Sequence, residues 1–236
     1  MADITREIDV PLLDSLAVEV DAEHHESMIT FARDMGDVMA RRRFLRGFGA
    51  IGAAGAALLL ASESAAATPV AAPNADDIAL LAWVRSLELA AVAAYDAALG
   101  SKKLSAAFAS IATMFRGHHQ QHADAIGGIA GRQVIASPNA AILAKLGPSF
   151  TGAKDEAALV TAAYDLENAA ASTYLAVIGK LIGTDGARLA ASIQPTEARH
   201  AFVLGQALQV NRATLLPERD NTSAALSAAD YPIVGK

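Results

Sequence analysis

Three glutamates stand in stretches of this chain that are otherwise apolar. Each is followed within three residues by alanine, and two are preceded directly by leucine; they are Glu88, Glu167 and Glu197. A carboxylate buried inside a bundle of helices costs several kcal/mol unless it is paired or bound to a metal ion. These positions therefore require positively charged or metal partners close by.

The histidines that follow residue 67 are candidate partners. They are His118, His119, His122 and His200. His119 and His122 are three residues apart, as are Glu197 and His200, so each pair shares one face of a helix. Imidazole nitrogens and carboxylate oxygens suit iron or manganese, and they also accept zinc or copper. The spacing predicts a metal site built from several helices.

Two tyrosines repeat a spacing relative to the glutamates. Tyr95 follows Glu88 by seven residues, and Tyr174 follows Glu167 by seven residues. Seven residues are two helical turns, so each tyrosine is expected on the face of the glutamate that precedes it. Two interpretations stay open: a core residue with a satisfied hydroxyl group, or a catalytic residue that donates a hydrogen bond or an electron.

Composition narrows the class of protein. The chain has 236 residues, no cysteine, 53% hydrophobic residues and a formal net charge of −6. Without cysteine there are no disulfides, thiolate metal sites or cysteine nucleophiles. The acidic balance argues against a nucleic-acid partner. Abundant alanine and leucine favour helices.

Capping residues and glycines divide the chain into four long helices. We expect them to end near residues 99, 130, 182 and 208, with a long crossover at 131–153 that carries a short helix over 140–146. Thr184-Asp185-Gly186 is expected to be a tight turn before the fourth helix. Pro195 either bends that helix or marks its start near Gln194. The bundle would cover residues 76–208, after a linker at 68–75 and before an irregular tail at 209–236.

The candidate residues follow one order along the chain: Glu88, His119, His122, Glu167, Glu197 and His200. This order resembles that of the ferritin-like superfamily, in particular its exported bacterial members, over residues 76–208. The resemblance implies an all-α fold, a ferritin-like four-helix bundle with a long crossover between its second and third helices. It also implies a centre of iron or manganese, dinuclear in the family, with zinc or copper less favoured.

The resemblance assigns roles to individual residues. Glu88, His122, Glu167, Glu197 and His200 map onto metal ligands, and Tyr95 and Tyr174 onto hydrogen-bonding or redox positions. The departure is His119, which stands where the family has a glutamate. An imidazole removes one negative charge and one bridging mode, so a mononuclear or asymmetric site is an alternative. We keep His119 as a candidate ligand, beside the alternative that it faces outward while His118 turns inward.

The segment before the bundle has the order of an export signal. Arg41-Arg42-Arg43-Phe44-Leu45-Arg46 precedes an apolar run and then Ala65-Ala66-Ala67. Basic, apolar and small-residue regions in this order are typical of a signal peptide, and the arginines resemble the twin-arginine export motif. We expect a signal peptide over 41–67, cleavage after Ala67, the twin-arginine translocation machinery as partner, and transient passage through the membrane. The alternative is an uncleaved membrane anchor.

Residues 1–40 form an acidic extension with a net charge of −8. Leu12, Leu13, Leu16 and Val18 give it a weakly amphipathic pattern. A cytoplasmic extension, a handle for a proofreading chaperone and a mistaken start codon are alternative interpretations.

The first functional expectation is an exported metal-binding protein in the periplasm, cell wall or extracellular space. Its activity would be that of an oxidase, a ferroxidase or a peroxide-consuming protein, and a homo-oligomer is a further expectation by analogy. The second is a non-enzymatic bundle that protects the envelope in stress or desiccation, with one metal ion or none. The third is a membrane-tethered interaction protein. A mineral-storing shell is less favoured because of the leader and the irregular tail.

Overall fold

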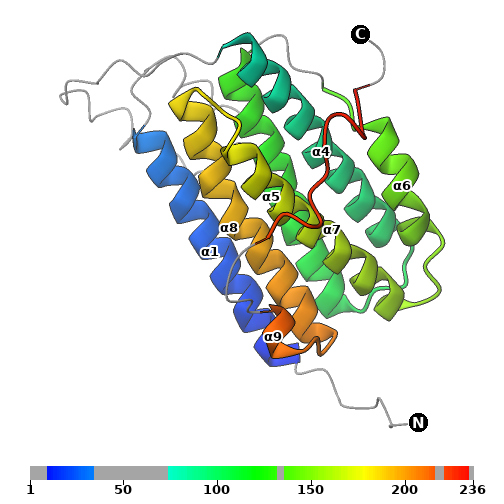
Figure 1. Cartoon of the computed structure of the whole chain (residues 1–236). Helices are drawn as coiled ribbons and strands as arrows, with labels where there is room; N and C mark the ends of the chain where they lie inside the picture. Colours follow the sequence, from blue (N-terminus) through cyan, green and yellow to red (C-terminus); the bar gives the residue numbers. More distant parts are fainter. Residues whose placement is uncertain (1–9, 35–73, 132–135, 216–220, 234–236) are drawn as a thin grey trace.

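The computed structural model describes residues 10–34, 74–131, 136–215 and 221–233. Every regular element in these ranges is a helix, and the long helices run side by side (Figure 1). The predicted all-α fold is therefore confirmed. The expected signal peptide and most of the linker lie outside the described residues.

Four helices make the bundle that the sequence predicts. They are α4 (Ala75–Gly100), α5 (Ala106–Ala130), α7 (Glu156–Ile178) and α8 (Thr184–Ala207). α4 packs against α5, and α7 packs against α8, so each pair forms an antiparallel hairpin. The crossover between the hairpins carries α6 (Ala140–Thr151), which contacts α4 and α7 and is longer than the short helix expected there.

Side-chain caps explain where these helices begin. The side chain of Asn74 accepts a hydrogen bond from the backbone N–H of Asp77, and the side chain of Asp155 accepts one from Ala158. Ser105 caps α5 in the same way. Each cap satisfies a backbone donor that has no partner inside its own helix.

The start of α8 differs from the expectation. Thr184, Asp185 and Gly186 form its first turn rather than a tight turn before it. The reason is Asp77 of α4, a buried carboxylate that accepts hydrogen bonds from the N–H groups of Ile182 and Gly183 at 2.9 and 2.7 Å. These bonds hold the connection between α7 and α8 at residues 179–183, before the position expected for the turn. α8 also runs through Pro195, which excludes a helix start near Gln194.

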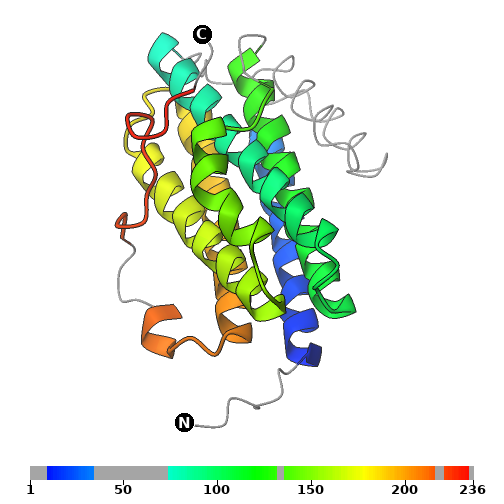
Figure 2. The same ribbon diagram turned by 90° about the vertical axis from the view of Figure 1, so that its right-hand side faces the viewer.

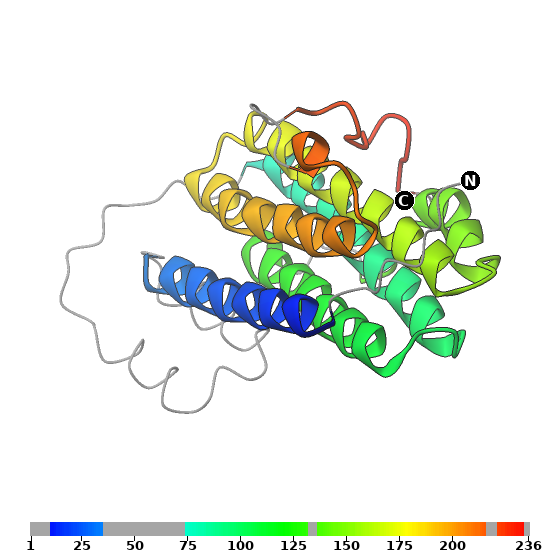
Figure 3. The ribbon, with the colours of Figure 1, turned by 90° about the horizontal axis from the view of Figure 1, so that it is seen from below.

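A fifth long helix, α1 (Val10–Asp34), packs against α8 and α5. It lies alongside α8 when the molecule is viewed from below (Figure 3). Leu12 and Val18 of the expected amphipathic pattern are exposed. Leu13 of that pattern is buried and Leu16 is partly buried against the core. The face in contact with the bundle is made by residues spaced mostly three or four apart: Leu13, Ala17, Val20, His24, Met28, Phe31 and Ala32. Part of the acidic extension thus belongs to the folded body.

The described part of the tail is irregular, as expected. After the short helix α9 (Arg212–Leu215), residues 221–233 run along the bundle (Figure 2). The Trp83 indole N–H donates to the Tyr231 carbonyl at 2.8 Å, and the Leu226 N–H donates to the Thr173 hydroxyl oxygen at 2.9 Å. The tail is therefore anchored at separate points on α4 and α7.

The apolar core is split into two clusters with a polar layer between them. One cluster includes Tyr95, Phe115 and Leu159, and the other includes Leu81 and Ile193. On each of α4, α5, α7 and α8 the candidate metal ligands stand between residues of the two clusters. Among the described helices, α4 is also long and apolar enough to cross a membrane, but much of it is buried in this core, as expected for the central helix of a bundle.

Asp77→Ala leaves the Ile182 and Gly183 N–H groups without their carboxylate. We expect it to lower the free energy of unfolding by about 2 kcal/mol, measured by urea denaturation. Asp76→Ala is the matched control, because Asp76 is an exposed acid in the same helical turn; its effect should stay below about 0.5 kcal/mol. Equal losses for the two variants would contradict this account of the α7–α8 connection.

Candidate metal centre

Six buried side chains from four helices meet at the centre of the bundle. α4 and α7 each contribute one glutamate, while α5 and α8 each contribute two residues three positions apart. They are Glu88, His119, His122, Glu167, Glu197 and His200, and none is more than 3% exposed. The structure thus brings all six predicted ligands together.

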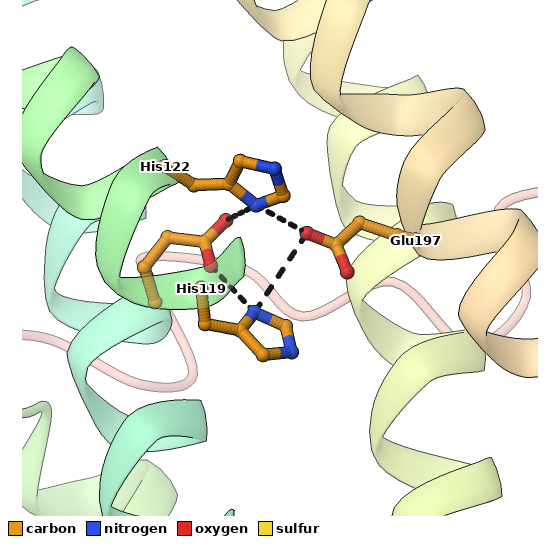
Figure 4. A group of neighbouring side chains, drawn as sticks. His119, His122 and Glu197 are labelled. Carbon is orange, nitrogen blue, oxygen red and sulfur yellow. Dashed lines mark hydrogen bonds and ion pairs between the residues drawn. The ribbon is translucent and has the colours of Figure 1, made fainter. Parts of the chain in front are cut away.

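The first group, here named site A, consists of Glu88, His119, His122 and Glu197. His122 Nδ1 lies 2.8 Å from Glu197 Oε1, and His119 Nδ1 lies 2.7 Å from Glu88 Oε2. Figure 4 shows His119 and His122 of α5 pointing toward Glu197 of α8. One donor atom from each residue falls within 4.8 Å of the others.

The second group, site B, consists of His119, Glu167, Glu197 and His200. His119 Nε2 lies 3.1 Å from Glu167 Oε1, and His200 Nδ1 lies 3.2 Å from Glu197 Oε2. Glu197 therefore turns one oxygen to each site, and His119 turns one ring nitrogen to a glutamate of each. Glu197 and His119 are thus shared by the two groups.

The structure decides between the two orientations considered for His118 and His119. Both side chains are buried, but His119 lies inside the centre and His118 lies behind it. His118 Nδ1 is 2.9 Å from His200 Nε2, and His118 Nε2 is 2.9 Å from Asp21 Oδ1 of α1. His119 therefore lies among the candidate ligands, and His118 contacts them from outside.

Opposite charges offset the cost of burying three carboxylates. Burial acts to raise the pKa of Glu88, but the positive charge of His122, 3.6 Å away, and the hydrogen bond with His119 outweigh it and lower that pKa to about 2. Burial likewise acts to lower the pKa of His122, but Glu197 and Glu88 raise it to about 9. The pKa of Glu167 is lowered in the same way, since His119 and His200 outweigh its burial.

The two tyrosines bind glutamates across the bundle. The Tyr95 hydroxyl donates to Glu167, and the Tyr174 hydroxyl donates to Glu88. Each tyrosine therefore bonds the glutamate of the other helix rather than the one seven residues before it. Burial, followed by the charge of the bonded glutamate, raises the pKa of each tyrosine well above its ordinary value. Both hydroxyl groups stay protonated and hold the carboxylates in place.

Residues 76–210 match the model of the ferritin-like domain family. This match covers more than half of the chain. The chain belongs to the ferritin-like domain family. Neither the curated proteins nor the solved structures gave a match. The matched segment contains all six central residues, whereas α1 lies before it.

The donor atoms of the ferritin-like bundle fit a metal ion. Among the described residues, neither ring nitrogen of His122 nor Oε1 of Glu197 has a hydrogen bond of normal geometry, although Nδ1 and Oε1 face each other at 2.8 Å. Buried polar atoms in native proteins nearly always have a partner, and a bound metal ion supplies one. Carboxylate and imidazole donors suit iron and manganese and also accept zinc.

Sequence reasoning missed two residues of α1 that reach this region. Asp21 contacts His118, and the His24 ring lies 4.1 Å from the His118 ring and 5.0 Å from the His122 ring, measured between centroids. The signal available in the sequence was their helical spacing: Asp21 and His24 are three residues apart, with Val20 and Met28 continuing the same face.

The charge pairing predicts how the stability of the metal-free chain depends on pH. His122 has its folded pKa raised from 6.5 to about 9, so its contribution is complete below pH 6.5 and is lost as pH rises through 9. Glu88 has its folded pKa lowered from 4.5 to about 2, so its contribution is present above pH 4.5 and is lost as pH falls through 2.

We therefore expect the free energy of unfolding to be highest near pH 6.5, because burial lowers the pKa values of His24 and His118 and these two imidazoles oppose folding as pH falls below that value. It should fall by roughly 3 kcal/mol toward pH 9, as measured by urea denaturation in the presence of a chelator. The His122→Asn variant should show a shallower decline. A wild-type profile that stays level over the alkaline range would show that these imidazoles are not paired as described.

Proposed function

We propose that this chain is an exported metal-dependent oxidoreductase that binds iron or manganese at sites A and B and reacts with a small oxidant. The observation that carries the proposal is the sharing of Glu197 and His119 between two buried four-residue groups. Two ions that each give up one electron supply the two electrons that convert peroxide, with two protons, to water. Zinc and copper suit the same donors but are less favoured.

The residues of the chain prepare the centre for such chemistry. Tyr174 and Tyr95 fix the orientation of Glu88 and Glu167, and the apolar clusters on both sides exclude water from the carboxylates. Preorganised donors in a dry site need little rearrangement when charge changes there. The Tyr95 and Tyr174 hydroxyl groups carry protons and are hydrogen-bonded directly to Glu167 and Glu88.

An apolar pocket gives a small molecule a route to site A. It lies between α4, α6 and α7, reaches Glu88, His119 and Tyr174, and has a volume of about 30 Å³. This volume suits one or two molecules the size of water. Leu146 of α6, Ala170 of α7 and Leu226 of the tail are among its lining residues. A pocket of this size and lining favours dioxygen or a similarly small oxidant.

The proposed destination rests on the basic, apolar and small-residue order of residues 41–67. Twin-arginine export carries folded proteins, which agrees with a centre assembled from four helices before export. We accordingly propose maturation after Ala67 and a periplasmic, cell-wall or extracellular location. The proposed partners are the translocation machinery and metal ions.

The charge pairing supports a second candidate function. Three glutamates and three histidines at the centre neutralise one another when the imidazoles are protonated, so the bundle has a balanced interior without metal. A non-enzymatic ferritin-like protein that protects the envelope would need no more than this. Metal content separates it from the oxidoreductase.

Metal content by mass spectrometry is the first test. Protein purified without chelator or affinity histidines should carry about two iron or manganese ions per chain, and Glu197→Gln should remove most of this metal. Glu156→Gln is the matched control, because Glu156 lies at the start of α7, away from the centre. About one ion per chain would identify a single asymmetric site. No metal in the wild-type protein would support the non-enzymatic alternative.

Filling the pocket should separate oxidant access from metal binding. In Ala170→Leu the larger side chain occupies the pocket, so oxidation of the loaded metal by dioxygen, followed by stopped-flow absorbance, should slow several-fold while metal content stays unchanged. Ala171→Leu is the control, because the neighbouring Ala171 lines a different groove. Equal rates in the two variants would show that the oxidant does not use this pocket.

A further inference from the structure

α1 covers one side of the metal centre. Its buried stripe contacts both apolar clusters of the bundle: Leu13, Ala17 and Val20 belong to one, and Met28 and Phe31 to the other. The polar layer of α1 lies between these two groups, at Asp21 and His24. The helix is therefore in register with the bundle, with apolar residues over apolar clusters and polar residues over the metal centre.

Polar contacts repeat this register. Asp21 Oδ1 is 2.9 Å from His118 Nε2, and His118 Nδ1 is 2.9 Å from His200 Nε2, so a chain of contacts links α1 to a candidate ligand. His24 Nε2 is 2.9 Å from Gln121 Oε1, and His24 is fully buried. Without α1, the sides of His118 and His122 that face it would lose this cover.

Two contacts to α8 lie within this polar layer and just beyond it. Arg199 pairs with Glu23 at 2.5 Å. The Ser27 hydroxyl donates to the carbonyl oxygen of Ser192 at 3.3 Å. α1 thus makes specific polar contacts with α8 as well as apolar ones.

The order of the sequence makes this cover removable. α1 ends at Asp34, the arginine run starts at Arg41, and the expected cleavage follows Ala67. Cleavage at that position separates α1 from every helix of the ferritin-like domain. Most of the stability of a helix in a protein comes from its tertiary packing, and after cleavage the contacts of α1 with the bundle become intermolecular and are weakened by dilution.

We propose that α5 and α8 form a binding surface for residues 10–34, and that severing the chain after Ala67 releases this helix and opens His118, His122 and His200 to small solutes. This inference rests on the export part of the proposed function. The centre is then closed while the leader is attached and becomes accessible once the leader is removed. The full-length chain would exchange metal slowly, and the matured chain would exchange it faster.

Histidine modification tests the cover without using metal. The full chain, with a specific protease site in place of residues 62–67, is prepared metal-free and treated with diethyl pyrocarbonate before and after cleavage and gel filtration. Fragment mass spectrometry reports each histidine separately. We expect His118 to react at least about tenfold faster after cleavage. If α1 stays bound through gel filtration and the rates do not change, the proposal is wrong.

A pair of variants tests the same contact in the uncleaved chain. Met28→Glu places a charge in the fully buried stripe, whereas Val18→Glu places the same charge at a position that is 65% exposed. Only Met28→Glu should speed the modification of His118. Hydrogen exchange in α4 and α7 should stay slow in both variants. If hydrogen exchange in α4 and α7 becomes fast in Met28→Glu, that variant has lost the bundle fold. The comparison of the wild-type chain before and after cleavage is then the test.

The outcomes separate this proposal from the proposed function. Faster modification after cleavage in a chain that binds no metal would support the removable helix and contradict the oxidoreductase. If the modification rate does not change in a chain that binds two metal ions, the result would support the oxidoreductase and contradict the removable helix. In cells, the intact mass of the exported protein should start at Thr68, and an exported protein that retains residues 10–34 would overturn the proposed release.

Discussion

Three carboxylates buried at the centre of a helical bundle are the constraint on which the rest of this structure depends. Burying Glu88, Glu167 and Glu197 in an apolar interior is costly without nearby positive charge, and the histidines of α5 and α8 supply it. The polar layer must also be sealed from water, which the two apolar clusters do on either side of it. The carboxylate and imidazole groups that balance one another in the metal-free centre also carry the donor atoms that suit iron or manganese.

The α4–α5 and α7–α8 hairpins share a seven-residue spacing between glutamate and tyrosine, and they also bond to each other reciprocally. Tyr95 of α4 bonds Glu167 of α7, and Tyr174 of α7 bonds Glu88 of α4, so each hairpin holds a carboxylate of the other. His119 breaks this correspondence, because it stands where Glu197 stands in the second hairpin. Its two ring nitrogens nevertheless contact Glu88 and Glu167. The substitution changes the charge of the centre without removing the contact between its two sides.

α1 extends the bundle beyond the ferritin-like segment. Its buried stripe follows the same alternation of apolar and polar layers as the four central helices. Asp21 and His24 lie at the level of the candidate metal centre, and the chain of contacts through His118 reaches His200. A segment that reads as an acidic extension in the sequence is thus packed against the part of the protein where chemistry is expected.

The sequence by itself determined the starts of α4, α5 and α7 and the residue types of the candidate site. Asn74, Ser105 and Asp155 cap their helices through contacts three residues away, and a pattern so local needs no tertiary information. Tertiary structure decided the start of α8, the bonding partner of each tyrosine, the inward position of His119 and the packing of α1. Those features join residues far apart in the chain. They depend on how each helix is rotated and shifted against its neighbours, which packing sets and sequence spacing does not.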